Sequence, residues 1–333
     1  MVLKDVFKRP LLDLRISVTD RCNMRCRYCM PREHFDKNHA YLPKSDILSF
    51  EEIVRVVESL LPAGLRKVRL TGGEPLIRKD LYKLIKQLRE LSPDLDIALT
   101  TNAQLLSKSI QDLKQAGLSR VTISLDAIDV DVYQAMGDTA STPDAIIESI
   151  DETLALGIPV KVNTVVQKGV NEHQVIPLIS QMGSRNIPIR FIEYMDVGAT
   201  NSWNLDHVMT GKEMRHLIEN EYGLIQPIKP DHPSDVARTY RTNSGSIIGF
   251  IESISNPFCG DCSRARLSAN GSIYTCLFAT EGFDLRGILR MDATKEDLTT
   301  AISAIWNQRR DRYSETRSKK TNLNRIEMSF IGG

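Results

Sequence analysis

The six cysteines of the chain fall into two groups of three, one near each end of the sequence. The first triplet is Cys22, Cys26 and Cys29, and the second triplet is Cys259, Cys262 and Cys276. Disulfides use cysteines in pairs and a closed structural zinc site needs four ligands, so two triplets predict two metal centres, each with one open coordination position. Three thiolates on a short loop are able to hold a [4Fe-4S] cluster with one free iron. A zinc site completed by His34 is the alternative at the first triplet.

The composition is that of an ordinary globular enzyme, with 333 residues, 41% hydrophobic and 26% charged. A net charge of +1 gives no global field for nucleic acid or an acidic membrane surface, so anion binding must come from local clusters of Arg and Lys. The first ten residues lack an apolar signal region, and no stretch reaches the roughly 18 apolar residues of a membrane span. We therefore expect a cytoplasmic protein with no nucleic-acid or membrane partner.

Short apolar or β-branched runs alternate with helical patterns over the first 195 residues. The predicted strands are residues 12–18, 67–70, 96–99, 120–125, 159–166 and 187–192. The predicted helices are residues 49–61, 80–90, 105–116, 141–156 and 172–182, and Ser49 with Glu52 predicts a capping box on the first of them. Alternation of this kind is typical of βα units and a parallel sheet.

Polar or glycine-containing clusters follow nearly every predicted strand, for example residues 19–22, 71–75 and 100–102. Functional residues at the ends of many strands are typical of a (β/α) barrel, whereas a dinucleotide-binding fold concentrates them at one switch point. About six units predict an α/β fold, an incomplete (β/α)6 TIM-like barrel. We assign residues 1–195 to this partial barrel with the first cluster. Residues 196–333 are assigned to a smaller C-terminal lobe that carries the second cluster, covers the open side and ends in a flexible Gly-Gly tail.

The first triplet, with Tyr28 between two of its cysteines, and the Gly72-Gly73-Glu74-Pro75 segment after the second strand resemble the radical S-adenosylmethionine (SAM) superfamily. The resemblance implies that SAM chelates the free iron of the first cluster and is cleaved to a 5′-deoxyadenosyl radical. It further implies SAM contacts at Tyr28, Gly73, Ser124 and Met195, all at strand ends or beside the cluster.

The second triplet leads into Arg264-Ala265-Arg266, which puts two guanidiniums at alternate positions beside the metal. Arginine binds phosphate oxygens in a bidentate manner and stays charged. Five further cations lie within predicted strands, namely Arg15, Lys67, Arg69, Lys161 and Arg190. Buried cations are costly unless paired, so these residues predict an anionic ligand such as a triphosphate in the barrel lumen. Ion pairs with Asp20, Glu74, Asp126 and Glu193 are the alternative.

From residues 13–20 to residues 331–333, the chain resembles the branch of this superfamily that cyclises GTP in molybdenum cofactor biosynthesis. The resemblance implies abstraction of the C3′ hydrogen of GTP, attack of the C3′ radical on C8, and formation of 3′,8-cyclo-7,8-dihydro-GTP. It implies a second [4Fe-4S] cluster that binds the purine, and catalytic roles for Arg264, Arg266, Gly332 and Gly333. The implied GTP-binding residues are Arg15, Lys67, Arg69, Thr100, Lys161, Arg190, Arg264, Ala265 and Arg266.

The same resemblance implies an external electron donor, and cyclic pyranopterin monophosphate synthase as the acceptor of the product. The oligomeric state stays open, with a homodimer as one arrangement. Ala103 stands where glycine is expected, and alanine disfavours a positive φ, so we expect a different local turn there. Two other functions stay open: a radical SAM maturase of a peptide or cofactor whose second cluster relays electrons, and a non-catalytic zinc or nucleic-acid-binding module.

Overall fold

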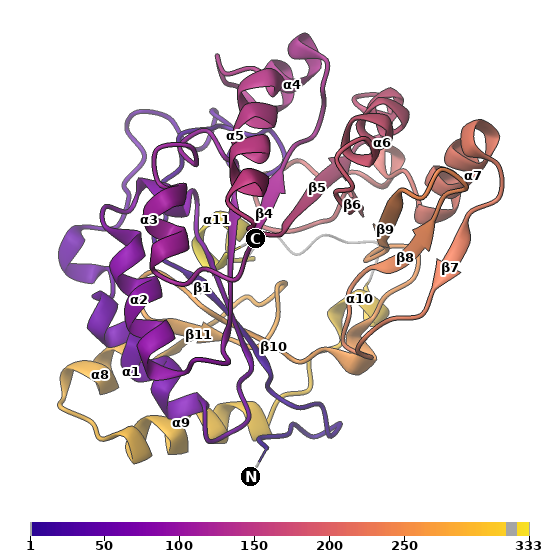
Figure 1. Ribbon diagram of the computed structural model, residues 1–333. Coiled ribbons are helices and arrows are strands. Elements are labelled where there is room, and N and C mark those ends of the chain that lie inside the picture. The colour runs from indigo at the N-terminus through magenta and orange to yellow at the C-terminus, as the bar shows by residue number, and fades with distance from the viewer. Residues whose placement is uncertain (1, 318–324, 333) are drawn as a thin grey trace.

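The computed structural model describes residues 2–317 and 325–332 of the chain, and its strands form one continuous twelve-stranded sheet (Figure 1). The strand order is β12-β11-β10-β1-β2-β3-β4-β5-β6-β9-β8-β7. The strands of the first 195 residues are β1 (Asp13–Ser17), β2 (Lys67–Thr71), β3 (Asp96–Thr101), β4 (Arg120–Ser124), β5 (Val160–Val166) and β6 (Ile189–Glu193). These six strands lie side by side and parallel, as the sequence predicted.

Helices cover the outer face of the curved sheet (Figure 1). They are α1 (Phe50–Leu60), α2 (Leu81–Leu91), α3 (Ile110–Gln115), α4 (Val130–Gly137), α5 (Pro143–Ala155) and α6 (Val175–Gly183). The predicted capping box is confirmed, because the Ser49 side chain accepts from Glu52 N and the Glu52 side chain accepts from Ser49 N. The predicted helix at residues 105–116 begins later, at Ile110, and α4 was not predicted because its eight residues carry only a weak amphipathic pattern.

The hydrophobic core lies between these helices and the sheet. In α1 the fully buried residues Ile53, Val56, Val57 and Leu60 recur at helical spacing and pack against the strands. Burial of each large aliphatic side chain contributes roughly 1.5–3 kcal/mol. Leu14 and Ile16 of β1 point into the same core, so Arg15 between them must point to the inner face of the sheet.

The chain beyond residue 195 adds strands to both edges of the sheet. β9 (Ile247–Ile251) pairs in parallel with β6, and β10 (Arg264–Leu267) pairs in parallel with β1. Antiparallel strands then extend each edge: β7 (Gln226–Ile228) and β8 (Arg238–Arg241) on one side, and β11 (Ser272–Tyr274) and β12 (Phe283–Asp284) on the other. The strand order ends at β12 and β7, so the described sheet is an open barrel rather than a closed one.

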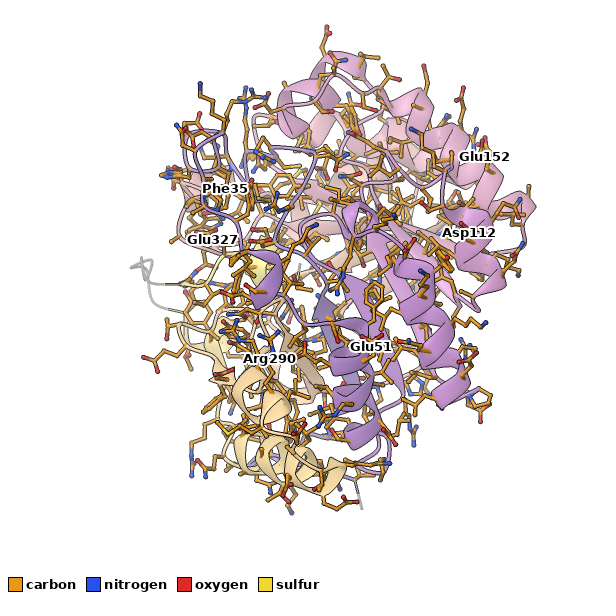
Figure 2. All side chains as sticks on the ribbon, turned by 90° about the vertical axis from the view of Figure 1, so that its left-hand side faces the viewer. Phe35, Glu51, Asp112, Glu152, Arg290 and Glu327 are labelled. Carbon is orange, nitrogen blue, oxygen red and sulfur yellow. The ribbon has the colours of Figure 1, made fainter. Side chains whose placement is uncertain are left out.

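The C-terminal helices are α7 (Gly211–Tyr222), α8 (Arg286–Arg290), α9 (Lys295–Asn307), α10 (Tyr313–Thr316) and α11 (Met328–Ile331). Two of them dock on α1: Arg290 of α8 forms an ion pair with Glu52 at 2.8 Å, and Thr299 of α9 donates to Ser59 O at 2.9 Å. Figure 2 shows the side of the molecule where Arg290 and Glu51 of α1 lie near each other. None of the described helices has the length and apolar character that a membrane span requires.

Candidate active site

One cavity of about 890 Å³ occupies the inside of the curved sheet, and both cysteine triplets line it. Alternate residues of a strand point to the same face, so each of β1 to β6 contributes residues at alternate positions to this space. The predicted site residues that line the cavity are Arg15, Cys22, Cys26, Tyr28, Cys29, Lys67, Arg69, Gly73, Thr100, Ser124, Lys161, Arg190, Met195, Cys259, Cys262, Arg264, Arg266 and Cys276. Ala265 points the other way and is fully buried in the hydrophobic core.

The two triplets lie at opposite ends of β1. The first triplet follows the C-terminal end of β1, where Ser17 is in register with Thr71. In the second triplet, Cys259 and Cys262 precede β10, whose first residue Arg264 is in register with Asp13 at the N-terminal end of β1. Cys276 follows β11, which runs antiparallel to β10 and so ends at the same side. At about 3.3 Å per residue, the four steps from Asp13 to Ser17 span roughly 13 Å. The cavity therefore has a separate cysteine triplet at each end, with the inner face of the sheet between them.

Backbone contacts hold the loop of the first triplet in place. The Arg25 guanidinium donates to Cys22 O at 2.9 Å, Met24 O at 2.8 Å and Phe35 O at 2.8 Å. The neighbouring loop packs closely against it, because a side chain at Gly73 would overlap the backbone of Arg21. The loop of the first triplet and the glycine loop thus form one packed surface at this end of the cavity.

Glu74 fixes the next strand end to the glycine loop. Its buried carboxylate accepts from Thr101 Oγ1 at 2.7 Å and from Asn102 N at 2.8 Å. Burial raises the pKa of Glu74 to about 7 in spite of these hydrogen bonds. Ala103 has a φ of 63°, so the expectation that alanine would avoid the left-handed conformation at this turn is wrong. The hydrogen bond from Ala103 N to Thr101 Oγ1 at 3.0 Å and the contacts of Glu74 stabilise the turn sufficiently for alanine to adopt it.

Tyr28 is held by a carboxylate that the sequence placed at the end of the fourth strand. Its hydroxyl donates to Asp126 Oδ2 at 2.6 Å, and Val165 N donates to Asp126 Oδ1 at 2.8 Å. Burial raises the pKa of Asp126 to about 6, although both hydrogen bonds oppose the shift. Asp126 therefore orients the tyrosine ring toward the cavity, beside Cys26 and Cys29.

The second triplet lies in a strongly cationic environment. Burial alone would raise the pKa of the Cys262 thiol, but the charges of Arg264 and Arg309 outweigh it and lower that pKa to about 6. Arg309 donates to Cys262 Sγ at 3.2 Å and to Cys262 O at 2.8 Å. Burial raises the pKa of Cys276 to about 11. Arg309 was missed by the sequence analysis because it lies just beyond α9, 47 positions from Cys262.

All six cysteines are free thiols in the structure, which excludes a disulfide framework. Across residues 2–317 and 325–332, no three His, Cys, Asp or Glu side chains are placed around one ion, as a zinc site would require. A four-iron cluster makes a different demand, because each thiolate binds a separate iron. Each triplet faces the cavity with three thiols, and within the part of the chain that the structure describes no His, Asp or Glu completes a set of ligands around one point with them. The donor sets therefore fit a [4Fe-4S] cluster with one free iron.

Three arginines form a row across neighbouring strands on the inner face. Arg15 of β1 is in register with Arg69 of β2 on one side and with Arg266 of β10 on the other. Burial and mutual repulsion lower the pKa of Arg15 to about 9 and that of Arg69 to about 10, and they also lower the pKa of Arg266. Arg69 and Arg266 are only 7% and 4% exposed. Such a row is unfavourable without an anion, so it indicates an anion-binding surface.

The predicted alternative of internal ion pairs fails for the four carboxylates considered. Asp20, Glu74, Asp126 and Glu193 accept hydrogen bonds from backbone or hydroxyl groups instead. Lys67 does form an ion pair, with Asp13 at 3.3 Å. Arg69 donates to the hydroxyls of Thr100 at 2.9 Å and Thr122 at 3.2 Å, and Arg190 donates to Asn163 Oδ1 at 2.9 Å. Arg69 and Arg190 therefore contact neutral groups rather than carboxylates.

Several cavity residues were not predicted, among them Asp13, Asp96 and Arg120. Arg120 forms an ion pair with Asp96 at 2.5 Å, and its Nε is buried without a partner among the described residues. Each of the three residues begins a strand, away from the polar clusters that follow the strands. The alternation rule that selected Arg15 and Arg69 would also have selected Asp13 and Arg120.

The C-terminal segment enters the site from outside the sheet. Met328 and Ser329 line the cavity, Arg266 donates to Ile331 O at 3.4 Å, and Gly332 lies against Thr71 with a φ of 79°. Glu327 anchors this segment by accepting from Ala199 N at 3.0 Å, and Figure 2 shows it beside the loop of Phe35. Gly333, predicted to be catalytic, lies outside the described residues.

Two family models match the chain. The radical SAM superfamily model matches residues 16–182, and the model described as Molybdenum Cofactor Synthesis C matches residues 187–315. A GTP 3′,8-cyclase of Staphylococcus epidermidis is 46% identical over 338 residues, covering 100% of this chain and 99% of the relative. A GTP 3′,8-cyclase of Staphylococcus haemolyticus is 45% identical over 337 residues, covering 99% of each chain.

The fold is similar to that of solved structures with little sequence identity. Streptococcus suis SuiB bound to S-adenosylmethionine has a TM-score of 0.61 at 16% identity, covering 96% of this chain and 73% of that one. SuiB bound to its precursor peptide SuiA has a TM-score of 0.62 at 16% identity, covering 94% and 68%. At this level of identity the likeness concerns the fold alone, which is the α/β partial barrel that the strand pattern predicted.

Proposed function

Because this chain belongs to the GTP 3′,8-cyclase family of the radical SAM superfamily, we propose that it converts GTP to 3′,8-cyclo-7,8-dihydro-GTP, an early step of molybdenum cofactor biosynthesis. The observation that carries the proposal is the row of Arg69, Arg15 and Arg266 inside a cavity that joins two cysteine triplets. A radical initiator at one end and a polyanion site between the triplets are what this reaction requires.

At the first end of the cavity, Cys22, Cys26 and Cys29 hold a [4Fe-4S] cluster in this proposal. With SAM bound, that cluster supplies the electron that generates a 5′-deoxyadenosyl radical. Tyr28, Gly73, Ser124 and Met195 are proposed to contact SAM. The hydrogen bond from Tyr28 to Asp126 orients the ring, and the tight packing of Gly73 against Arg21 keeps the loop backbone in one position.

At the other end, Cys259, Cys262 and Cys276 hold the second [4Fe-4S] cluster, which we propose to bind the purine. The triphosphate then runs along the inner face of the sheet, where the row of guanidiniums compensates its charge. The proposed GTP contacts are Arg15, Lys67, Arg69, Thr100, Lys161, Arg190, Arg264, Ala265 and Arg266. Ala265 contributes only backbone to such a contact, because its side chain lies in the core.

Between the two ends, the ribose of GTP is proposed to lie with C3′ toward SAM and C8 within reach of C3′. Arg264 and Arg266 are proposed to hold the nucleotide during the radical step, and Gly332 is proposed to shield this region from water. Gly333, which lies outside the described residues, is proposed to assist the same step. Ile331 is fully buried and Arg266 contacts its carbonyl oxygen, which supports a role for the tail inside the site. Exclusion of water preserves the radical for the intended hydrogen.

Further parts of the proposal concern organisation and partners. We propose residues 1–195 as the SAM-binding partial barrel and residues 196–333 as the part that contributes the second cluster and the Gly-Gly tail. We propose an external electron donor, because reductive cleavage of SAM consumes an electron that must be supplied to the cluster. Cyclic pyranopterin monophosphate synthase is the proposed acceptor of the product, in the cytoplasm, and a homodimer is the proposed assembly.

The test is mass spectrometry of the 5′-deoxyadenosine formed when the reduced, anaerobic holoenzyme meets SAM and GTP deuterated at C3′. Deuterium in the deoxyadenosine supports GTP as substrate and C3′ as the abstraction site. Unlabelled deoxyadenosine in the presence of GTP would contradict the proposal. Arg266→Ala serves as the companion variant: a maturase with an electron-relay cluster would keep its turnover, whereas the cyclase would lose deuterium transfer.

A further inference from the structure

Arg309 occupies a buried position directly behind the second triplet. It is 4% exposed, and its guanidinium contacts both Cys262 and Thr275 and two carboxylates, one of them Asp311 at 3.5 Å. It donates to Cys262 Sγ at 3.2 Å, to Cys262 O at 2.8 Å and to Thr275 O at 3.0 Å, and it forms an ion pair with Asp5 at 3.3 Å. Thr275 precedes Cys276, so Arg309 contacts the backbone beside two of the three cysteines.

A second arginine completes this arrangement from the N-terminal segment. Arg9 is 3% exposed, forms an ion pair with Asp5 at 2.6 Å, and donates to Cys259 O at 2.8 Å. Asp5 therefore lies between two arginines that together contact the backbone at or beside all three cysteines. Trp306 closes the cluster, since its Nε1 donates to Arg9 O at 3.1 Å and its ring lies 4.5 Å from the Arg309 guanidinium.

We propose that Arg309, held in place by Asp5, is a positioning residue that sets the reduction potential of the second cluster through its hydrogen bond to the Cys262 sulfur. The inference rests on the proposed function only in taking the second triplet as a cluster site. The Asp5, Arg9 and Arg309 cluster is joined to the cysteines by backbone and sulfur contacts. Arg309 itself lines the cavity at the second triplet, but it is not one of the proposed GTP contacts on the inner face of the sheet.

The physical argument concerns the charge on the cluster. Reduction adds an electron, part of whose density lies on the sulfur ligands, and a hydrogen bond from a cation stabilises that added charge. Hydrogen bonds to the sulfurs and the local charge are among the features that set cluster potentials. Arg309 provides both at a buried atom where water does not screen the interaction. Its loss should therefore make the second cluster harder to reduce.

Arg309→Lys is a partial substitution, because lysine keeps the positive charge but loses the planar guanidinium and its several donors. One ammonium cannot reach Cys262 Sγ, Thr275 O and Asp5 together in the way that a guanidinium does. Glutamine keeps a donor and removes the charge. We expect the midpoint potential of the second cluster to fall in the order wild type, Arg309→Lys, Arg309→Gln, while the potential of the first cluster stays constant.

The experiment is an EPR-monitored reductive titration of the anaerobically reconstituted holoenzyme and its variants. The signal of the first cluster is identified by its change on addition of SAM, so it serves as an internal reference in every sample. Arg55→Lys is the matched control. Arg55 also joins the C-terminal chain to the barrel, through Leu289 O at 2.9 Å and Ala293 O at 2.5 Å, but it lies outside the cavity.

A selective downward shift in Arg309→Lys and Arg309→Gln, absent in Arg55→Lys, supports the proposal. An unchanged potential in a variant that retains both clusters overturns it, even if iron is lost 10- to 100-fold faster to a chelator, as expected for a purely structural contact. If Arg309→Gln loses the second cluster, the midpoint potential of the second cluster in Arg309→Lys is the test: a downward shift supports the proposal and an unchanged potential overturns it. The readout needs no GTP turnover, so failure of the cyclase proposal and failure of this one are separate results.

Discussion

Replacing Arg69 with methionine should stabilise the enzyme without substrate and weaken GTP binding. Arg69 is 7% exposed, has no carboxylate partner among the described residues, and stands beside Arg15. Its pKa falls from 12.5 to about 10, first because of burial. The folded state therefore disfavours the charged form of Arg69. This cost is complete below pH 10 and is relieved as the pH rises from 10 toward 12.5.

The magnitude follows from the shift. At 1.36 kcal/mol per pKa unit, the buried charge costs about 3 kcal/mol at pH 7. Methionine removes that cost but also removes the hydrogen bonds to Thr100 and Thr122, each contributing about 1 kcal/mol. The side chain points into a cavity rather than a packed core, so little packing is lost. Arg69→Met should therefore raise the free energy of unfolding by about 1 kcal/mol.

Substrate should reverse this order of stability. A hydrogen bond to a charged group contributes about 1.5–3 kcal/mol, so the variant should bind GTP roughly 10- to 100-fold more weakly. At a GTP concentration 100 times the wild-type Kd, the wild type gains about 2.7 kcal/mol of stability. A variant with 100-fold weaker binding gains only about 0.4 kcal/mol under the same conditions.

The assay is urea unfolding of the anaerobic, cluster-loaded protein, followed by circular dichroism with and without GTP, together with calorimetric titration of GTP. Arg55→Met is the matched control, because it removes two hydrogen bonds outside the cavity and should lower stability without changing GTP affinity. A less stable Arg69→Met protein in the absence of GTP, or one with wild-type GTP affinity, would refute the argument that the cationic row exists for the substrate.

Three further predictions test other parts of the site. Gly332→Ala should lower turnover several-fold with little change in GTP affinity, because the new side chain would overlap Thr71 at a positive φ; equal turnover in a steady-state assay would contradict this. Asp126→Asn should remove a pH-dependent loss of stability. The pKa of Asp126 is raised to about 6, so wild-type stability falls by about 2 kcal/mol relative to the variant as the pH rises from 4 to 7. Parallel pH profiles of the urea midpoints would reject that assignment. Ala103→Gly should relieve about 1–2 kcal/mol of backbone strain at the positive φ. It also removes a buried methyl group and makes the unfolded chain more flexible, and both effects lower stability. The free energy of unfolding should therefore stay within about 1 kcal/mol of wild type.

The six central strands could be predicted because their signals are local. Each contains a short apolar or β-branched run, nearly all are followed by a polar cluster, and the first five are followed by a predicted amphipathic helix. The helix at residues 105–116 was predicted too long because Leu105 and Leu106 continue the apolar spacing, while the structure uses residues 104–109 as turns after Ala103. The local pattern thus predicted the six strands and five of the helices, but it placed some of their boundaries several residues away from those in the structure.

The placement of the C-terminal strands could not be predicted in the same way. β10 is four residues long with two arginines, and its partner β1 lies about 250 positions earlier in the chain. Its pairing depends on Ala265 and Leu267 joining the core beside Leu14 and Ile16, which no local pattern reveals. Arg309 escaped notice for the same reason, because only the tertiary fold brings it to Cys262.

The pairing of β10 with β1 explains why this barrel carries chemistry at both ends. Barrel enzymes usually place their sites at the C-terminal ends of the strands and fill the interior with layers of aliphatic side chains. Here Arg15, Arg69 and Arg266 replace such a layer, and the second triplet lies at the N-terminal end of β1. A hollow, cationic interior is unfavourable for folding, so the packing must be recovered on the helical face and the charge must be compensated by the ligand. The cations inside apolar strands were therefore the most useful sequence signal. Burying them is unfavourable unless an anionic ligand is bound between the two ends of the cavity.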